Sequence, residues 1–294
     1  MFIREDVDFL SHGVRCSAWF YRPKREEKYP VIVMAHGLGG VREMRLDAYA
    51  ERFVQAGFAC FLFDYRNFGA SDGRERQKIS VKEQLGDWHH AIDFVKQDGQ
   101  VNQEEILLFG TSFSGGHVIV LSSQRTDIRA SIAQCPYTDT LATLRTVPLL
   151  TGLKTIPVAI ADKLGAVLGC RPLMLKLAGA PNSAAIMAVP DYGECFRLIP
   201  ANYDFINQAP ARTLLEFLTY SPSRYTQNVQ CPIFYAVCLK DSLAPAKETI
   251  ACAKRSVHGV IGEYDMGHFE IYLGQAFEQV IRDYIDFYGQ VLAD

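Results

Sequence analysis

The 294-residue sequence has no excess of charge of either sign. Its 30 Lys and Arg residues stand against 33 Asp and Glu residues, which gives a formal net charge of -3 at pH 7. Without a basic excess or a block of like charge, the composition argues against a dedicated binder of nucleic acid or of anionic membranes. Hydrophobic residues make up 49% of the chain and are spread along it, which excludes a long disordered protein.

A long uninterrupted apolar run is also absent. The N-terminal residues 1–8 include acids where a signal peptide would have its apolar stretch. The longest uncharged run, residues 106–124, is interrupted by polar and glycine residues between positions 110 and 117, so it does not predict a membrane helix. We therefore expect no membrane span and a cytoplasmic protein.

No Cys-x-x-Cys pair occurs among the eight cysteines, which are scattered along the chain. Cys60, Cys135 and Cys238 lie in apolar runs typical of strands, where a thiol behaves as a small hydrophobic group. This usage predicts free, buried thiols in a reducing cytoplasm rather than disulfides or a metal site. The histidines also lack metal-ligand spacing, so we expect neither a metal nor another cofactor.

Short apolar runs alternate with longer helical patterns along most of the chain. The apolar runs predict strands at residues 31–35, 58–63, 106–109, 132–135, 233–238 and 257–264. The patterns between them predict helices at residues 44–56, 80–98, 114–124, 246–254 and 270–290. Continuously apolar strands separated by helices are typical of a mostly parallel, doubly wound α/β sheet. Residues 9–22 predict an antiparallel hairpin at one edge of this sheet.

The alternation stops between residues 137 and 228. Short apolar segments follow one another there, and eight prolines interrupt them. We interpret residues 137–228 as several short helices that form a cap, inserted into a core of residues 1–136 and 229–294. The alternative is that the segment is simply more core. An insertion at the carboxyl ends of the strands would cover the usual ligand crevice of an open α/β sheet.

The strongest motif is a strand that runs directly into a glycine-rich helix start. The segment reads Ile106-Leu-Leu-Phe-Gly-Thr-Ser-Phe-Ser-Gly-Gly-His117. A serine on such a sharp turn forms a nucleophile elbow, and the residues two before and two after it must be small. Around Ser112 these residues are Gly110 and Ser114, although glycine is usual at the later position. Ser114 is the alternative nucleophile, but Ser112 would then replace the first glycine.

This turn resembles the nucleophile elbow of the α/β-hydrolase superfamily, and further motifs extend the resemblance over residues 30–120. Residues 33–40 are similar to the first oxyanion loop of these hydrolases. The resemblance implies that the backbone N–H groups of Leu38 and Phe113 stabilise the oxyanion of acyl transfer. It also implies that His36 is a structural residue of the loop rather than a base.

The loop of residues 63–73 is similar to the loop that follows the next strand in these hydrolases. By the same resemblance, Asp64, Arg66 and Gly69 brace this loop rather than take part in the chemistry. The overall pattern resembles bacterial and fungal cytosolic hydrolases of the dienelactone-hydrolase and acyl-peptidase neighbourhood. Similar fungal proteins include polyketide transferases and thioesterases.

The superfamily places an acid and then a histidine after the serine in chain order. Asp241 follows the apolar strand and is identified by this resemblance as the acid that orients the base. His268 lies in a Gly-His-Phe loop after the last strand and matches the base of the family, a role that suits imidazole because it titrates near neutrality. Asp265 is the alternative acid, but it lies in the same loop, three residues before His268.

The sequence therefore predicts a serine hydrolase that cleaves a carboxylic ester or thioester of a small apolar substrate through an acyl-serine intermediate. The first alternative is an acyltransferase, polyketide transferase or thioesterase of a biosynthetic pathway, because the residues do not distinguish water from an alcohol as the acyl acceptor. The alternative of another class is a non-catalytic α/β hydrolase that binds a small ligand under its cap. We expect no nucleic-acid partner, and a homodimer stays open.

Overall fold

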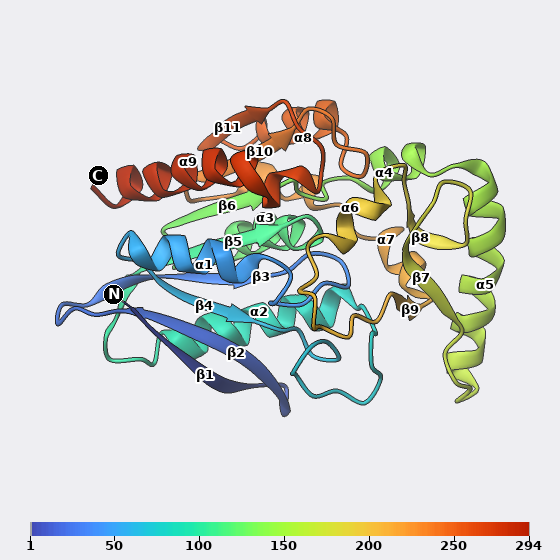
Figure 1. Ribbon diagram of the computed structural model, residues 1–294, viewed down its shortest axis with the longest axis horizontal. Helices are drawn as coiled ribbons and strands as arrows, with labels where there is room; N and C mark the ends of the chain where they lie inside the picture. Colours follow the sequence, from blue (N-terminus) through green and yellow to red (C-terminus); the bar gives the residue numbers. More distant parts are fainter. Residues whose placement is uncertain (1, 294) are drawn as a thin grey trace.

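The computed structural model describes residues 2–293, and an eight-stranded sheet lies at its centre (Figure 1). The strands are β1 (Phe2–Ser11), β2 (Val14–Pro23), β3 (Tyr29–Ala35), β4 (Ala59–Phe63), β5 (Val101–Thr111), β6 (Ala130–Gln134), β10 (Ile233–Cys238) and β11 (Gly259–Tyr264). Their order across the sheet is β1-β2-β4-β3-β5-β6-β10-β11. β1 pairs with β2 and β2 with β4 in antiparallel orientation, and the other pairs are parallel. The predicted α/β architecture with an antiparallel hairpin at one edge is confirmed, although the hairpin is longer than residues 9–22.

Helices cover both faces of the sheet. They are α1 (Leu46–Gln55), α2 (Val81–Val95), α3 (Phe113–Gln124), α8 (Ala246–Ala253) and α9 (Gly274–Ala293). Tyr49 of α1 contacts Phe109 of β5 and Tyr284 of α9, so α1 and α9 share one face. The next residue of β5, Gly110, faces α3, because a Cβ on it would lie 2.6 Å from Val118 of that helix. Since successive strand residues point to opposite faces, α3 lies on the other side of the sheet.

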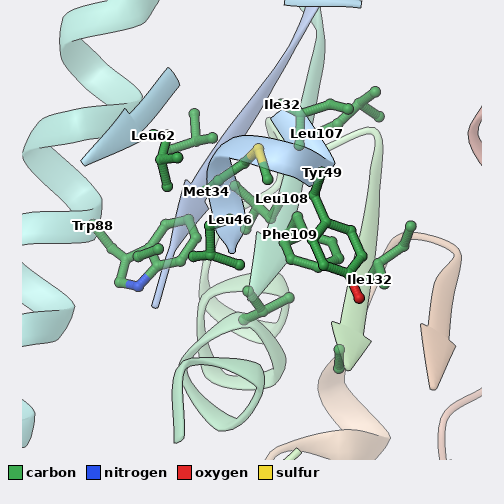
Figure 2. Close-up of a cluster of buried hydrophobic side chains, with 14 of the residues drawn as sticks. Ile32, Met34, Leu46, Tyr49, Leu62, Trp88, Leu107, Leu108, Phe109 and Ile132 are labelled. Atoms are coloured by element: carbon green, nitrogen blue, oxygen red, sulfur yellow. The ribbon is translucent and has the colours of Figure 1, made fainter. Parts of the chain in front are cut away.

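The central strands are buried on both faces. Every residue of β3 and β4 is buried, and so are the last six residues of β5. Figure 2 shows Ile32 and Met34 of β3 packed with Leu107 of β5, between Tyr49 of α1 and Trp88 of α2. This double burial explains why these strands read in the sequence as continuous apolar runs rather than as alternating ones.

The segment between β6 and β10 lies at one end of the molecule, where α5 forms its outer edge (Figure 1). Its helices are α4 (Thr140–Thr146), α5 (Leu149–Val167), α6 (Tyr192–Phe196) and α7 (Thr213–Phe217), followed by the 3₁₀ turns η1 (Pro222–Arg224) and η2 (Thr226–Asn228). It also contains a sheet with the order β8-β7-β9, formed by β7 (Met174–Gly179), β8 (Ala185–Ala188) and β9 (Gln208–Pro210). The expectation of short helices alone was therefore incomplete.

The inserted segment differs from the expectation in two ways: it contains a sheet, and one of its helices, α5, is long. In β7, Leu175 and Leu177 are buried and Met174 and Lys176 are exposed, which is the two-residue period of a strand rather than a helical pattern. α5 is 19 residues long in spite of Pro157, which lies on its exposed side. Among residues 2–293, no helix combines the length and the hydrophobicity needed to cross a membrane.

One buried carboxylate ties α5 to the small sheet. Asp162 is 1% exposed, and its Oδ1 accepts a hydrogen bond of 2.8 Å from the N–H of Leu173, just before β7. Its Oδ2 accepts one of 2.9 Å from the N–H of Arg212, and the guanidinium of Arg212 pairs with the same carboxylate at 3.3 Å. A single side chain therefore fixes three segments that are distant in sequence.

We predict that Asp162→Ala lowers the free energy of unfolding by about 2 kcal/mol, because two part-buried N–H groups lose their acceptor and Arg212 keeps only Glu75 as an ionic partner. Urea unfolding followed by circular dichroism measures the effect. Asp162→Asn serves as the matched control. Its free energy of unfolding should fall less, since its amide oxygen still accepts one of these bonds. An alanine variant as stable as the wild type would show that the carboxylate does not hold the segment.

Candidate active site

Three loops at the carboxyl ends of the strands bring Ser112, His268 and Asp241 together. Ser112 stands between β5 and α3, Asp241 follows β10, and His268 follows β11. Nε2 of His268 lies 3.0 Å from Oγ of Ser112, and its Nδ1 lies 2.7 Å from Oδ2 of Asp241. In a neutral imidazole with the proton on Nδ1, that N–H donates to the carboxylate and Nε2 accepts from the serine hydroxyl.

The backbone at Ser112 makes a reversed turn. Its φ is +56°, a region that residues with a side chain seldom adopt. The N–H of Ser112 donates to the carbonyl of Gln134 at 2.8 Å, and its carbonyl accepts from the N–H of Tyr137 at 2.9 Å. A Cβ on Gly110 would lie 2.3 Å from the carbonyl oxygen of Ser114, so the turn closes only with glycine there.

Ser114, the alternative nucleophile, is fully buried and has a hydrogen-bond partner. Its Oγ lies 2.7 Å from the hydroxyl of Tyr65. The same hydroxyl accepts a bond of 2.7 Å from the indole N–H of Trp88 on α2. Tyr65 thus links Ser114 to Trp88, and this chain of bonds anchors the start of α3 to the core.

The surroundings of Asp241 and His268 stabilise a charged pair. Oδ1 of Asp241 accepts hydrogen bonds from the N–H groups of Leu243 at 2.8 Å and Ala244 at 2.7 Å, which leaves Oδ2 for the imidazole. Complete burial of His268 lowers its pKa, but the charge of Asp241, its hydrogen bond and the charge of Asp191 outweigh burial. The pKa of His268 is therefore raised above its ordinary value of 6.5.

Two other carboxylates lie near the histidine loop. Asp265 is 74% exposed and pairs with Lys240 at 3.0 Å, so it points into solvent rather than toward His268. Asp191, between β8 and α6, accepts a hydrogen bond of 2.6 Å from Ser242, next to Asp241. Sequence reasoning missed Asp191 because nothing in its local pattern indicates that the inserted segment folds back onto this loop.

The first loop passes directly over Ser112. A Cβ on Gly37 would lie 2.9 Å from Cβ of Ser112, so glycine permits this close approach. Leu38 follows it at the rim of the site. Phe113 is the first residue of α3, where a backbone N–H has no acceptor within its own helix. The structure thus places both predicted oxyanion donors next to Ser112.

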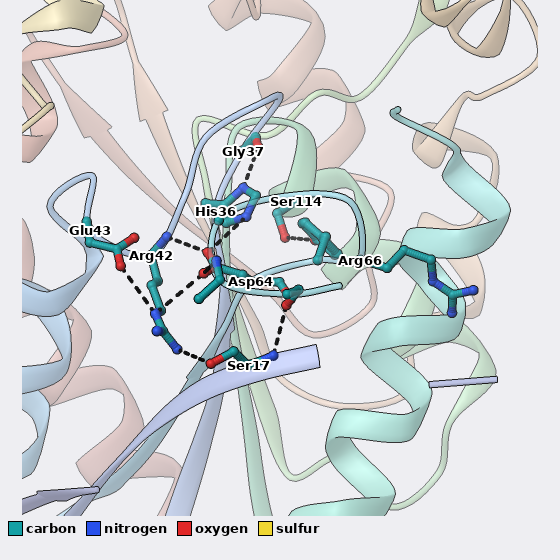
Figure 3. Close-up of polar contacts among 12 residues, drawn as sticks. Ser17, His36, Gly37, Arg42, Glu43, Asp64, Arg66 and Ser114 are labelled. Carbon is teal, nitrogen blue, oxygen red and sulfur yellow. Dashed lines mark hydrogen bonds and ion pairs between the residues drawn. The ribbon is translucent and has the colours of Figure 1, made fainter. Parts of the chain in front are cut away.

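Asp64 holds two loops of the site together (Figure 3). Its carboxylate accepts hydrogen bonds from the N–H groups of Arg42 at 2.9 Å and Ala70 at 3.1 Å. The guanidinium of Arg42 lies 3.4 Å from the same carboxylate. A Cβ on Gly69, whose φ is +49°, would lie 2.2 Å from Oδ2 of Asp64, so only glycine fits beside this carboxylate.

His36 lies in the same braced region. Its Nδ1 donates to the carbonyl of Gly37 at 3.0 Å, and its Nε2 lies 3.8 Å from Asp64. Burial lowers the pKa of His36 to about 4, so the ring is neutral at physiological pH. Arg66 makes an ion pair of 2.6 Å with the buried Asp87 of α2. These contacts are structural, as the resemblance implied.

Two cavities meet at Ser112. The larger, about 180 Å³, extends beneath α4 and α5. Its walls include Leu38, Ser112, Phe113, Thr151, Thr155, Ala159 and Met187. The smaller, about 50 Å³, lies on the side of the histidine loop, and its walls include Gly37, Leu38, Ser112, Met187, His268 and Tyr272. A substrate with its reacting carbon at Ser112 would therefore have one large and one small compartment.

The described residues contain one group with the donor atoms of a metal site, formed by Cys135, Asp241 and His268. Their donor atoms lie within 4.8 Å of one another. Burial raises the pKa of the Cys135 thiol far above its ordinary value, so it is a neutral thiol and a weak ligand. The other two residues are hydrogen-bonded to each other. All eight cysteines are free, as predicted, and Cys170 alone is exposed.

Known proteins resemble the chain in sequence and in fold. A family model described as serine aminopeptidase, S33, matches residues 25–260. The quorum-quenching protein AidA of Acinetobacter baumannii is 43% identical over 288 residues, which cover 98% of this chain and 95% of that protein. The thiohydrolase aneE of Aspergillus aculeatus is 26% identical over 302 residues, covering 98% of this chain and 93% of that one.

The crystal structure of the α/β hydrolase GrgF from Penicillium sp. sh18 matches the fold with a TM-score of 0.83. The match covers 99% of this chain and 100% of that chain, at 21% sequence identity. At this identity the likeness is one of fold. It extends over the inserted segment as well as the central sheet.

Proposed function

The chain belongs to the serine aminopeptidase, S33, family of α/β hydrolases, and from this premise we propose that Ser112, His268 and Asp241 act together as a catalytic triad for acyl transfer. The observation that carries the proposal is the continuous hydrogen-bonded chain from Oγ of Ser112 through the imidazole of His268 to the carboxylate of Asp241. It has the geometry in which a base activates a serine and an acid orients the base.

The reaction follows from the positions of these groups. Oγ of Ser112 attacks the carbonyl carbon of the substrate while its proton moves to Nε2 of His268. The oxyanion accepts hydrogen bonds from the N–H groups of Leu38 and Phe113. The leaving alcohol or thiol takes the proton from His268, and an acyl-serine remains. Water then attacks the acyl group and gives a proton to His268; the bond to Oγ breaks, His268 returns this proton to Ser112, and the carboxylic acid leaves. In both steps the carboxylate of Asp241 stabilises the imidazolium.

The preferred substrate in this proposal is a carboxylic ester or thioester with a small apolar acyl group. The larger cavity supports it, because its walls are mainly apolar side chains of the inserted segment. Residues 137–228 then act as a cap over a core of residues 1–136 and 229–294. The relative named a thiohydrolase supports a thioester as one of the leaving groups. The eight free thiols support a reducing, cytoplasmic location.

An acyltransferase is the second candidate, and the smaller cavity favours it. This cavity adjoins both Ser112 and His268, so an alcohol bound there could take the place of water as the acyl acceptor. Product analysis with acyl thioesters and an added alcohol separates the two reactions. A non-catalytic binder remains the alternative of another class, and labelling of Ser112 by a fluorophosphonate would exclude it.

We predict that Ser112→Ala lowers kcat for a p-nitrophenyl ester by about 10⁶-fold, because the nucleophile is lost. Ser114→Ala is the matched control: its hydroxyl is buried against Tyr65, so most of the activity should remain. Circular dichroism and thermal unfolding confirm that both variants fold. Equal losses in the two variants, or a loss in Ser114→Ala alone, would overturn the choice of nucleophile.

The raised pKa of His268 predicts the pH profile of kcat/KM. Because only the neutral imidazole accepts a proton, activity should fall on acidification with a midpoint above 6.5. Asp241→Asn removes the charge that raises this pKa, so its acidic midpoint should move to lower pH.

The same substitution should lower kcat by about 10⁴-fold, which is less than the loss of about 10⁶-fold expected for His268→Ala. Rate measurements across pH 4 to 9 at high enzyme concentration test both effects. An unchanged midpoint and a wild-type rate in Asp241→Asn would remove this residue from the triad.

We predict that kcat/KM rises from acetyl to hexanoyl esters until the larger cavity is full. Each added methylene contributes about 0.8 kcal/mol at most, which is roughly fourfold in kcat/KM. Ala159→Val, in the cavity wall, should move the optimum to shorter chains. Ala161→Val, on the exposed side of the same helix, is the matched control and should leave the profile unchanged. A flat or falling profile in the wild type would show that the cavity does not bind the acyl chain.

A further inference from the structure

The outward side of α5 is apolar where a solvated helix would be polar. Its spacing of three and four residues aligns six large side chains on one side of the helix. They are Leu149, Leu153, Ile156, Ile160, Leu164 and Val167, and they are between 48 and 80% exposed. The opposite side of α5, with Thr151, Thr155, Ala159 and Asp162, is the buried one. We call the six exposed residues the α5 stripe.

Nothing in the described part of the chain covers this stripe. α5 lies at the outer edge of the molecule, with β7, β8 and β9 on its inner side (Figure 1). The neighbouring helix α4 adds Leu141 and Leu144, which are 64 and 45% exposed. An exposed apolar surface of this extent is a feature of proteins that bind a partner or a lipid surface there.

The exposed charges on α5 and on the segments next to it in sequence have one sign. Between residues 140 and 190 the exposed charged side chains are Arg145, Lys154, Lys163, Arg171 and Lys176. The only acid in that range, Asp162, is buried and paired with Arg212. With 3.6 residues per turn, Lys154 and Lys163 fall on opposite flanks of the stripe. The whole-chain charge of -3 conceals this local basic excess.

A second copy of the chain does not suit this surface. If two α5 helices packed against each other through the stripe, each copy would bring a pair of Lys side chains, Lys154 and Lys163, to the two flanks of the contact. The stripe has no exposed acid that could neutralise such a pair. The surface combines exposed apolar side chains with basic ones. A partner that offers an apolar phase next to negative charge complements both.

We propose that the α5 stripe docks on an anionic lipid surface, with α5 lying in the plane of the interface. An interfacial helix places its apolar side among the acyl chains and its Lys and Arg side chains at the anionic headgroups. Leu144 and Ile156 belong to the exposed surface and also line the larger cavity. A lipophilic ester could therefore pass from the lipid surface into the cavity, a step that rests on the proposed function, whereas docking itself does not.

Flotation with lipid vesicles tests the docking. The full-length chain should float with vesicles of phosphatidylglycerol and phosphatidylcholine in equal parts, and much less with phosphatidylcholine alone. The double variant Leu153→Ser/Leu164→Ser and the double variant Lys154→Glu/Lys163→Glu should each weaken binding by at least about tenfold. Leu10→Ser/Val257→Ser, which replaces two comparably exposed apolar residues far from α5, is the matched control and should bind like the wild type.

Two further measurements keep docking apart from catalysis and from dimerisation. Ser112→Ala should bind vesicles like the wild type, and both α5 variants should turn over a short soluble ester at the wild-type rate. Absence of vesicle binding, or equal binding by every variant, would overturn the proposal. A dimer seen by sedimentation equilibrium and abolished by Leu153→Ser/Leu164→Ser would also overturn it, and would assign the stripe to contact between two copies.

Discussion

The reversed backbone at Ser112 is the constraint to which the rest of the site is fitted. A residue with a side chain stays at a φ of +56° only where its surroundings leave it no alternative. Main-chain bonds to Gln134 and from Tyr137 fix the turn on one side. Gly37 and Gly110 permit the approach of the neighbouring chain on the other. Strand, helix start and first loop thus converge on one half-buried hydroxyl.

Much of the fold could be read from the sequence because the central sheet imposes a simple pattern. Strands buried on both faces must be apolar throughout, and Val31–Ala35 and Ile233–Cys238 show this directly. The small sheet of the inserted segment escaped prediction since its strands are short and its alternation covers few residues. Its shortest strand, Gln208–Pro210, has three residues and no pattern of its own. Tertiary contacts, such as those of Asp162, decide its structure.

In the site, too, some residues could be predicted from the sequence and others reach it only through the tertiary fold. That Ser112, Asp241 and His268 lie together could be expected, because the resemblance to the superfamily supplies their chain order and each follows a strand. Asp191 could not, since it reaches the histidine loop only through the folding of the inserted segment. The exposure of α5 could not be predicted either. A run of Leu, Ile and Val looks the same in a sequence whether its side chains enter a core or face outward.

The bond between Ser112 and Tyr137 constrains how the inserted segment can be replaced. Tyr137 is the first residue of the proposed cap, and its N–H donates to the carbonyl of the proposed nucleophile. Gly116 adjoins the same junction, because a Cβ there would lie 2.5 Å from the carbonyl oxygen of Tyr137. The boundary between the core and the proposed cap therefore lies in direct contact with the turn at Ser112. A graft that gives this core a new lid should be joined after Tyr137, so that the host keeps its own backbone past the serine.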